Sequence, residues 1–414
     1  MHPAWFMVAL AFTTQFVANG VGIYSFGILL GPLVEDLDAS RAGVSFINFY
    51  MSIAGAFMGP LLGRAVLVIP INRIMAVGAL TLSLSFYAMS FAESLWQLQL
   101  GYAVGVSFGL GTLSGVPAAT LIVNWFEQRR ALALGIAGVG VSLAGFVMAP
   151  VTAAWVDTYG WRVTFQLFSA FSLSVVPIIG WFAWGHPSER GAAAYGATER
   201  AAGEAVETEP PLSTRQILRN PNLWYTAIAG GITFMGATAL ITHSPSLGQD
   251  AGYDRVAASW LVAILAVSAA VAKLLFGAIA ERTGERGAFL LSLGLQMIGL
   301  IGIAQLRGSY PLLLAMTSVF GLGMGGALPI MNALLARLFG QASFGPAMGL
   351  CAPIMTATQA IGAPLLGYIY DVRGDYTLGL WLFAGALLIP TAGMLLMRVE
   401  PRDPVIAKTD QSPA

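Results

Sequence analysis

The sequence predicts an all-α membrane protein: twelve transmembrane helices in two six-helix bundles that are related by pseudo-two-fold symmetry. Three observations lead to this fold class. Of the 414 residues, 57% are hydrophobic and only 10% are charged, against about 25% charged in an average soluble domain. The apolar residues form long blocks separated by short polar breaks, as transmembrane helices do. Motifs of the first half also return in the second half at constant spacing.

Each apolar block is roughly 20 residues or longer, which is enough for a helix to cross the hydrocarbon core. The first block directly follows Met1–Ala4, is too long for a signal-peptide core and has no small-residue cleavage site after it. We therefore expect it to be retained as the first helix. The twelve blocks occupy residues 5–33, 42–66, 74–92, 97–123, 130–155, 162–184, 221–246, 256–280, 287–306, 310–336, 343–369 and 375–397.

The basic residues predict the orientation in the membrane. If the N-terminus is cytoplasmic, fourteen of the twenty Lys and Arg residues lie on the inside and five on the outside. This asymmetry predicts a multi-pass protein of the cytoplasmic (inner) membrane with both termini in the cytoplasm. The five outside are Arg41, Arg162, Arg255, Arg307 and Arg373, which leaves Lys273 within the membrane.

Residues 185–219 separate the two bundles. They are rich in Gly, Ala, Glu and Pro and lack the apolar periodicity of a helix, so we expect a cytoplasmic linker. The predicted organisation is a first bundle at 1–184, this linker, a second bundle at 220–398 and a cytoplasmic tail at 399–414.

The two bundles carry the same motif at an offset of 214 residues. "APVTAAWVDTYG" at 149–160 matches "APLLGYIYDVRG" at 363–374, so that Asp157 pairs with Asp371 and Gly160 with Gly374. The matches run in the same direction along the chain, which indicates a duplicated six-helix unit. Parallel repeats of this kind enclose a central site in known transporters.

Lys273 is a cation inside an apolar block. It lies about 7–8 Å from the expected midplane, at a rise of 1.5 Å per residue. It shares a helix face with the small residues Ala266, Ala270 and Gly277, which mark a packed side rather than a lipid-facing side. No carboxylate lies within any predicted helix core, so we expect an anionic substrate to be its counter-ion. Snorkelling to the headgroups is the alternative reading.

Other polar residues in the blocks are weaker candidates. His243, at the outer end of the seventh block, suits proton coupling or gating, although an interfacial histidine bonded to backbone fits equally well. Possible substrate-binding hydrogen-bond partners include Tyr24, Asn19, Asn332 and Gln359. For each of them, a hydrogen bond between helices is the default reading.

Enzyme chemistry is not expected. "GVSFG" (105–109) and "GLGMGG" (321–326) match a nucleophile elbow and a dinucleotide fingerprint, but both lack the strand that these motifs require. We find no cluster of metal ligands, no cofactor motif and no basic cluster interleaved with aromatics for nucleic acid. The single cysteine, Cys351, excludes an internal disulfide.

One loop motif resembles the major facilitator superfamily, whose members carry Gly-x-x-x-Asp-Arg-x-Gly-x-Arg between helices two and three and again between helices eight and nine. In the first copy Leu67, Val68 and Pro70 replace the acid, the base and the glycine. The resemblance implies a cytoplasmic latch between the bundles, made here by the second copy alone. That copy consists of Gly277, Glu281, Arg282, Gly284 and Arg286.

Longer stretches are similar to the monocarboxylate porter and oxalate:formate antiporter branch, as found in bacteria. They include "ANGVGIYSFGILLGPLVEDL" (18–37), "NWFEQRRALALGIAGVG" (124–140) and "YGWRVTFQLFSA" (159–170). This branch places a basic residue, usually Arg, four residues before the latch glycine, where Lys273 precedes Gly277. Proton-coupled members have an Asp where this chain has Ala269, and a lysine where it has Tyr24.

The residues and the resemblance together predict a secondary transporter of a small organic anion, most simply a monocarboxylate, that binds Lys273. Proton symport and exchange against a counter-anion both stay open. The alternatives are a dicarboxylate exchanger, an exporter of drugs or cations, and a sensor without transport. The expected partners are the carboxylate and the lipid bilayer, and the resemblance implies a monomer.

Overall fold

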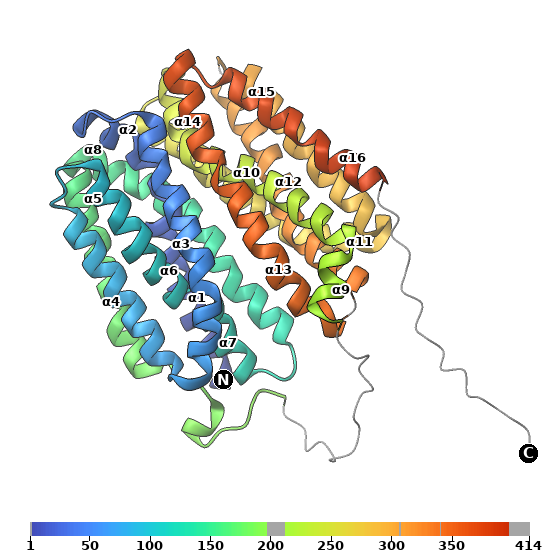
Figure 1. Cartoon of the computed structure of the whole chain (residues 1–414). Coiled ribbons are helices and arrows are strands. Elements are labelled where there is room, and N and C mark those ends of the chain that lie inside the picture. The colour runs from blue at the N-terminus through green and yellow to red at the C-terminus, as the bar shows by residue number, and fades with distance from the viewer. Residues whose placement is uncertain (1, 197–211, 306–307, 340, 397–414) are drawn as a thin grey trace, which may run out of the picture.

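The computed structural model describes residues 2–196, 212–305, 308–339 and 341–396, and these are helical almost throughout. Among them, the one β pairing is an isolated bridge between Phe126 and Tyr195. Figure 1 shows the blue-to-green helices as one group and the yellow-to-red helices as a second group beside it. The all-α prediction is confirmed.

The first group contains ten helical elements. Three of them, α1, η1 and α2, follow one another with almost no break, as do α5, η2, α6 and α7. The bounds are α1 (Ala4–Asn19), η1 (Gly20–Tyr24), α2 (Phe26–Asp36), α3 (Arg41–Val68), α4 (Ile71–Met89), α5 (Leu95–Leu100), η2 (Gly101–Val106), α6 (Ser107–Leu113), α7 (Gly115–Trp125) and α8 (Arg130–Phe182).

The second group follows two short linker helices, η3 (Pro187–Arg190) and α9 (Thr214–Arg219). Its elements are α10 (Pro221–Asp250), α11 (Arg255–Gln305), α12 (Tyr310–Phe339), α13 (Gln341–Ala360), α14 (Gly362–Arg373), α15 (Thr377–Ala386) and α16 (Leu388–Leu396). We refer to residues 2–184 as the N-terminal half and to residues 220–396 as the C-terminal half.

Each half has its own hydrophobic core. One cluster of buried side chains runs from Ala4 to Ala183, and a second runs from Ile217 to Met394. A third, smaller cluster joins the halves: Tyr24, Ile28, Ala144, Ala149 and Ala153 pack there against Val262 and Ala266. Its residues are mostly small, so the helix backbones of the two halves approach closely.

Two glycines divide the long helices into separate crossings. Gly160 interrupts α8 with φ 77° and ψ 168°, and Gly374 follows α14 with φ 75°. Residues with a side chain rarely adopt a positive φ, which explains why both positions are glycine. The two positions are the pair matched at an offset of 214, so both halves turn at corresponding points of the repeat.

Within the described residues, ten helices are long and apolar enough to cross a membrane. One of them, Leu132–Phe182, contains the break at Gly160 and so covers two of the predicted crossings. α3 corresponds to the predicted block 42–66 but is not among the ten. The count of twelve therefore remains a prediction.

The two ends of the bundle differ in what they contain. One end, which we call the terminal end, holds the start of α1 and the start of α10. The opposite end, which we call the far end, holds α2, the start of α3 and the turn from α14 to α15 (Figure 1).

The linker expected at residues 185–219 contains helical structure in part. Residues 197–211 lie outside the described residues, as does the tail at 399–414. The part next to the C-terminal half forms α9, because Ser213 and Gln216 make a reciprocal capping box at its start. Ile217 of α9 is buried in the core of that half.

Candidate functional site

A central cavity with two lobes lies between the halves. The smaller lobe has a volume of about 280 Å³ and the larger about 720 Å³. Asn19, Ile23, Met51, Ser52 and Gln359 line both, so the lobes are continuous. The described residues that line the lobes are uncharged.

The π-helix η1 widens the first crossing next to this cavity. Ser25 closes the wide turn, since both its backbone nitrogen and its hydroxyl donate to the Gly20 carbonyl oxygen, at 3.1 and 2.8 Å. π-turns inside helices are frequent at functional sites. This one ends at Tyr24, whose side chain lines the smaller lobe.

Three of the four predicted polar candidates meet at the cavity. Tyr24, Asn19 and Gln359 line the smaller lobe. The Asn19 amide donates to the Gln15 carbonyl oxygen and to Ser114 Oγ, so part of it already serves packing. Asn332 lines neither lobe, and its Oδ1 is buried without a hydrogen-bond partner.

Lys273 lies on the face of α11 that is turned toward the N-terminal half. Val262 and Ala266 of this face pack into the cluster between the halves, and Lys273 follows Ala266 by two helical turns. Its Nζ lies 3.5 Å from Ser142 Oγ on α8. Lys273 is itself exposed, as are the neighbouring Leu274 and Leu275 at 75% and 52%.

The position of Ser142 connects Lys273 to the cavity. Val141, the residue before Ser142, lines the smaller lobe. Neither Lys273 nor Ser142 itself lines a lobe, so Val141 is the link between the Lys273–Ser142 contact and the cavity. Among the described residues, no carboxylate pairs with Lys273. Ser142 was not among the predicted site residues, since one serine among many in an apolar helix carries no distinguishing signal.

The halves are tied together at the far end. The Arg41 guanidinium, at the start of α3, binds both carboxylate oxygens of Asp250 on α10, at 2.8 and 3.0 Å. Asp371 of α14 accepts from the backbone nitrogens of Arg41 and Ala42, at 3.0 and 2.9 Å. Arg255, at the start of α11, pairs with Asp157 of α8 at 2.7 Å.

His243 is at the centre of these contacts and is completely buried. Its Nε2 lies 3.0 Å from Ser45 Oγ of the N-terminal half and 2.9 Å from the Ala363 carbonyl oxygen. Its Nδ1 lies 3.1 Å from the Tyr376 hydroxyl. One turn closer to the cavity, the Asn48 amide donates to Thr242 Oγ1 at 2.7 Å. These contacts close the cavity toward the far end.

Tyr376 links His243 to Arg41, which donates to the Tyr376 hydroxyl. Burial raises the pKa of this hydroxyl above its usual range, although the nearby Arg41 works in the opposite direction. Tyr376 therefore keeps its proton and can donate it in a hydrogen bond.

Among the far-end residues, only His243 was predicted as a site residue. The 214-residue repeat could have indicated several of the others. Asp36 and Asp250, like Arg41 and Arg255, are separated by 214 residues, the same offset as Asp157 and Asp371.

The predicted latch residues lie at the terminal end of the C-terminal half. Gly284 breaks α11 with φ 72°, and Arg282 is exposed. Arg286 donates to the Leu395 carbonyl oxygen of the same half. Gly277 borders a small cavity of about 250 Å³ between α11 and α12. The side chain of Glu281 lies outside the described residues.

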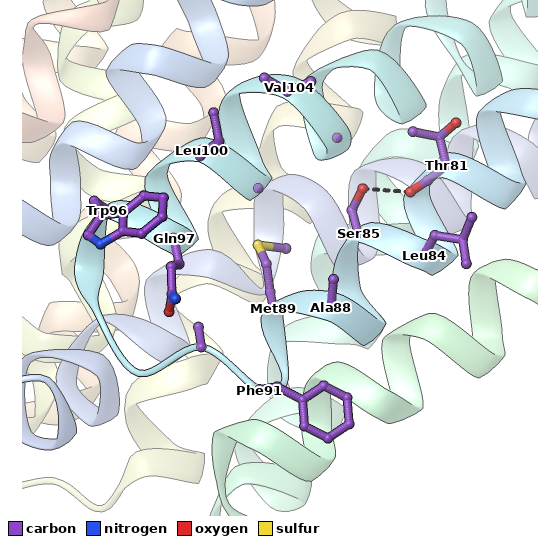
Figure 2. Close-up of a pocket in the computed structure, with 13 residues that line it drawn as sticks. Thr81, Leu84, Ser85, Ala88, Met89, Phe91, Trp96, Gln97, Leu100 and Val104 are labelled. Atoms are coloured by element: carbon purple, nitrogen blue, oxygen red, sulfur yellow. Dashed lines mark hydrogen bonds between the residues drawn. The ribbon is translucent and has the colours of Figure 1, made fainter.

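Another cavity, of about 620 Å³, lies away from the interface, between α4 and the segment from α5 to η2. Figure 2 shows Trp96 and Phe91 at its edge and the hydrogen bond from Ser85 to Thr81 inside it. Its lining is uncharged and mainly apolar, and the side chains at its rim are exposed. We interpret it as a lipid-facing groove rather than a substrate site.

Sequence comparisons give a family and a set of relatives. The profile of the Major Facilitator Superfamily matches residues 10–304 and 226–413. Monocarboxylate transporter 13 of Bos taurus is 30% identical over 403 residues, covering 95% of this chain and 88% of the relative. Monocarboxylate transporter 11 of Homo sapiens is 28% identical over 399 residues, covering 93% and 80%. These relatives are mammalian, whereas the sequence patterns pointed to bacterial members of the branch.

Solved structures give the same fold. A bacterial homolog to the human lysosomal transporter Spinster, inward-facing and unoccupied, has a TM-score of 0.76 at 16% identity and covers 95% of this chain and 96% of its own. The nucleoside transporter NupG has a TM-score of 0.75 at 14% identity and covers 96% and 100%. At such identities the likeness concerns the fold alone.

Proposed function

This chain belongs to the Major Facilitator Superfamily, and we propose that it carries a small organic anion, most simply a monocarboxylate, across the cytoplasmic membrane. The observation that carries the proposal is Lys273: a cation at the interface of the halves, beside the central cavity, without a carboxylate partner among the described residues. The names of the mammalian relatives support a carboxylate as cargo.

The substrate carboxylate takes the place beside Lys273 that no carboxylate of the described residues fills. Leaving a cation in the membrane interior costs about 2.5–3.5 kcal/mol on insertion scales, and a bound anion offsets this cost. Ser142 Oγ lies close enough to share the same carboxylate. Tyr24, Asn19 and Gln359 then face the rest of the substrate in the smaller lobe.

Transport requires the two ends of the cavity to open in turn. We assign the terminal end to the cytoplasm, because the basic residues favour both termini inside. The far end then faces outward and is closed, with the larger lobe on the cytoplasmic side. Neutralising Lys273 lets the halves rock about the site, so that the far end opens while the terminal end closes. His243 belongs to the outer gate, and the residues from Gly277 to Arg286 to the cytoplasmic latch.

Transport into proteoliposomes tests the role of Lys273. Labelled monocarboxylates, dicarboxylates and cations are offered with and without a pH gradient. We expect Lys273→Gln to lower carboxylate uptake by about 10–100-fold, because a charge-assisted hydrogen bond contributes roughly 1.5–3 kcal/mol. Lys273→Arg keeps the charge and should retain part of the uptake.

The controls separate loss of binding from loss of folding. Both variants should elute as a single monodisperse peak and melt within a few degrees of the parent. Normal carboxylate uptake by Lys273→Gln would contradict the proposal. Uptake of cations and not of anions by the parent would favour the drug or cation exporter instead.

A further inference from the structure

We propose that a proton on His243 opens the outer gate, so that this gate closes only over a neutral imidazole. The proposal goes beyond anion transport and does not depend on the identity of the cargo. It rests on the hydrogen bonds and charges around His243.

The hydrogen bonds assign the tautomer of the closed gate. The Ala363 carbonyl oxygen, 2.9 Å from Nε2, can only accept, so Nε2 carries a hydrogen. Ser45 Oγ already donates to the Arg41 carbonyl oxygen at 2.7 Å, and so it can accept from Nε2 as well. Tyr376 accepts from Arg41 and can donate to Nδ1. A neutral ring thus satisfies every polar atom of the cluster.

A second ring proton breaks this arrangement. Placed on Nδ1, it points at the Tyr376 oxygen, to which Arg41 already donates. The hydroxyl hydrogen of Tyr376 then loses its acceptor. The imidazolium would also be a second cation in the same buried cluster as the Arg41 guanidinium, and like charges repel strongly where water is excluded.

The carboxylates nearby are already engaged. Both oxygens of Asp250 bind the Arg41 side chain, and Asp371 accepts from the first backbone nitrogens of α3. Tyr370 of α14 stacks on Arg41, whose Cζ lies 3.6 Å from the ring centroid. None of these groups is free to neutralise a charged His243.

The other described elements that pack against α10 add no free counter-charge. α13, α15 and α16 contain no charged residue, and Arg337 of α12 pairs with Glu285. Asp375, in the turn before Tyr376, accepts from the Thr377 nitrogen. α2 has its carboxylates, Glu35 and Asp36, at its outer end, and Asp36 pairs with Arg162. On α11, Arg255 pairs with Asp157, while Asp254 accepts from the Ala257 nitrogen.

Opening the gate removes the conflict. Arg41 and Ser45 move away with the N-terminal half, whereas His243, Ala363 and Tyr376 all belong to the C-terminal half. Water then reaches the ring, and Tyr376 loses its competing donor. The proton binds while the gate is open and leaves before the gate closes, so His243 senses the outside pH and does not carry a proton inward with the cargo.

Electron–electron distance measurements on the full chain in lipid nanodiscs test the proposal. Spin labels are placed at Glu93→Cys and Arg373→Cys, two exposed outer positions, one in each half, with Cys351 replaced by Ala. We expect the long-distance population to rise several-fold between about pH 8 and about pH 5.5, the range in which histidine titrates.

Two substitutions decide whether His243 is responsible. His243→Gln offers an amide that can donate to Ala363 and accept from Tyr376 but cannot titrate, so the outer distance should stay short at both pH values. His186→Gln replaces an exposed linker histidine and should keep the full pH response. A parent without a pH response, or a His243→Gln variant that retains it, overturns the proposal.

A second measurement needs no change at His243. Asp157→Cys and Arg255→Cys, joined by a short thiol cross-linker, hold the outer gate closed. In this protein, labelled with ¹⁵N-histidine, the His243 ring should remain neutral over the same pH range. Normal titration of His243 in the cross-linked protein overturns the proposal. Neither experiment uses a substrate, so the result is independent of whether Lys273 binds an anion.

Discussion

Lys273 and His243 are both polar residues inside membrane helices, but their surroundings give them different roles. Lys273 has a single hydroxyl nearby, that of Ser142, whose neighbour Val141 lines the cavity. His243 has hydrogen-bond partners on both ring nitrogens and no exposed surface. A charged group without a counter-ion can bind a ligand. A group whose hydrogen-bonding atoms all have partners can act only when those hydrogen bonds break. On this basis we propose that Lys273 binds the anion and that His243 acts in gating.

At the residue scale, Gly374 allows a direct test of the turn between α14 and α15. Its φ is 75°, and no atom lies within 4 Å of where a Cβ would be, so a substitution meets backbone strain alone. We expect Gly374→Ala to lower the free energy of unfolding by about 1–2 kcal/mol. Gly385→Ala, in α15 and equally free of contacts, is the control. It should leave the free energy of unfolding unchanged or raise it slightly. Thermal unfolding in detergent measures both; equal effects would contradict the explanation.

At the element scale, two helices that correspond in the repeat each have an N-terminus that contacts the opposite half. α3 begins at Arg41 and α11 at Arg255, 214 residues later, and each is contacted by the aspartate of the duplicated motif, Asp371 or Asp157. The contacts are not identical, because Asp371 binds backbone nitrogens at the helix N-terminus while Asp157 binds a side chain. An ion pair with exposed groups contributes about 0–1 kcal/mol. A carboxylate on a helix N-terminus contributes roughly 0.5–2 kcal/mol.

We therefore expect Asp371 to matter more than Asp157 for closing the outer gate. Asp371→Asn should raise the ratio of open to closed outer gate by about 5–30-fold, corresponding to 1–2 kcal/mol, and Asp157→Asn by less. The spin-label pair at positions 93 and 373 measures this ratio. Asp36→Asn is the matched control, because its partner Arg162 belongs to the same half. A shift in the control as large as that of Asp371→Asn would argue against the assignment.

At the scale of the whole molecule, each half has its own core and a small contact cluster joins the two. We therefore expect the halves to move against each other as two bodies. Apart from the contact between Lys273 and Ser142, the described polar contacts between the halves gather at the far end, and the larger lobe of the cavity lies toward the terminal end. Opening one end while closing the other keeps the small-residue cluster near the middle in contact. This arrangement suits rocking about the substrate site.

A cross-link at the far end tests this motion. In the Cys351→Ala background, Asp157→Cys and Arg255→Cys joined by a short thiol cross-linker should stop carboxylate exchange in proteoliposomes, because the outer gate cannot part. A cross-linker that contains a disulfide should allow recovery on reduction. Each single-cysteine protein should exchange carboxylate at the same rate before and after this treatment. Exchange that continues at the parental rate after complete cross-linking would rule out rocking of these halves.

Much of the architecture could be predicted because it depends on local composition. Apolar blocks, their length and the glycines at the turns reflect interactions within one helix and with lipid. The cavity residues Tyr24, Asn19 and Gln359 were predicted from their polarity in apolar helices, and the structure brings them together. Asn332 has the same polarity but lies elsewhere, since the cavity-facing side of a helix depends on how it packs.

Hydrophobicity, charge and repeat spacing were sufficient to establish a helical membrane protein with a duplicated organisation and one cation in the membrane. The packing of the two halves was needed to establish that Lys273 meets Ser142 and that Arg41 bonds to Asp250 and Tyr376. It was also needed to show that His243 is enclosed by residues from α3, from α14 and from the turn before α15. The reason is that these contacts join residues more than 100 positions apart, and their geometry depends on which conformation the two halves adopt.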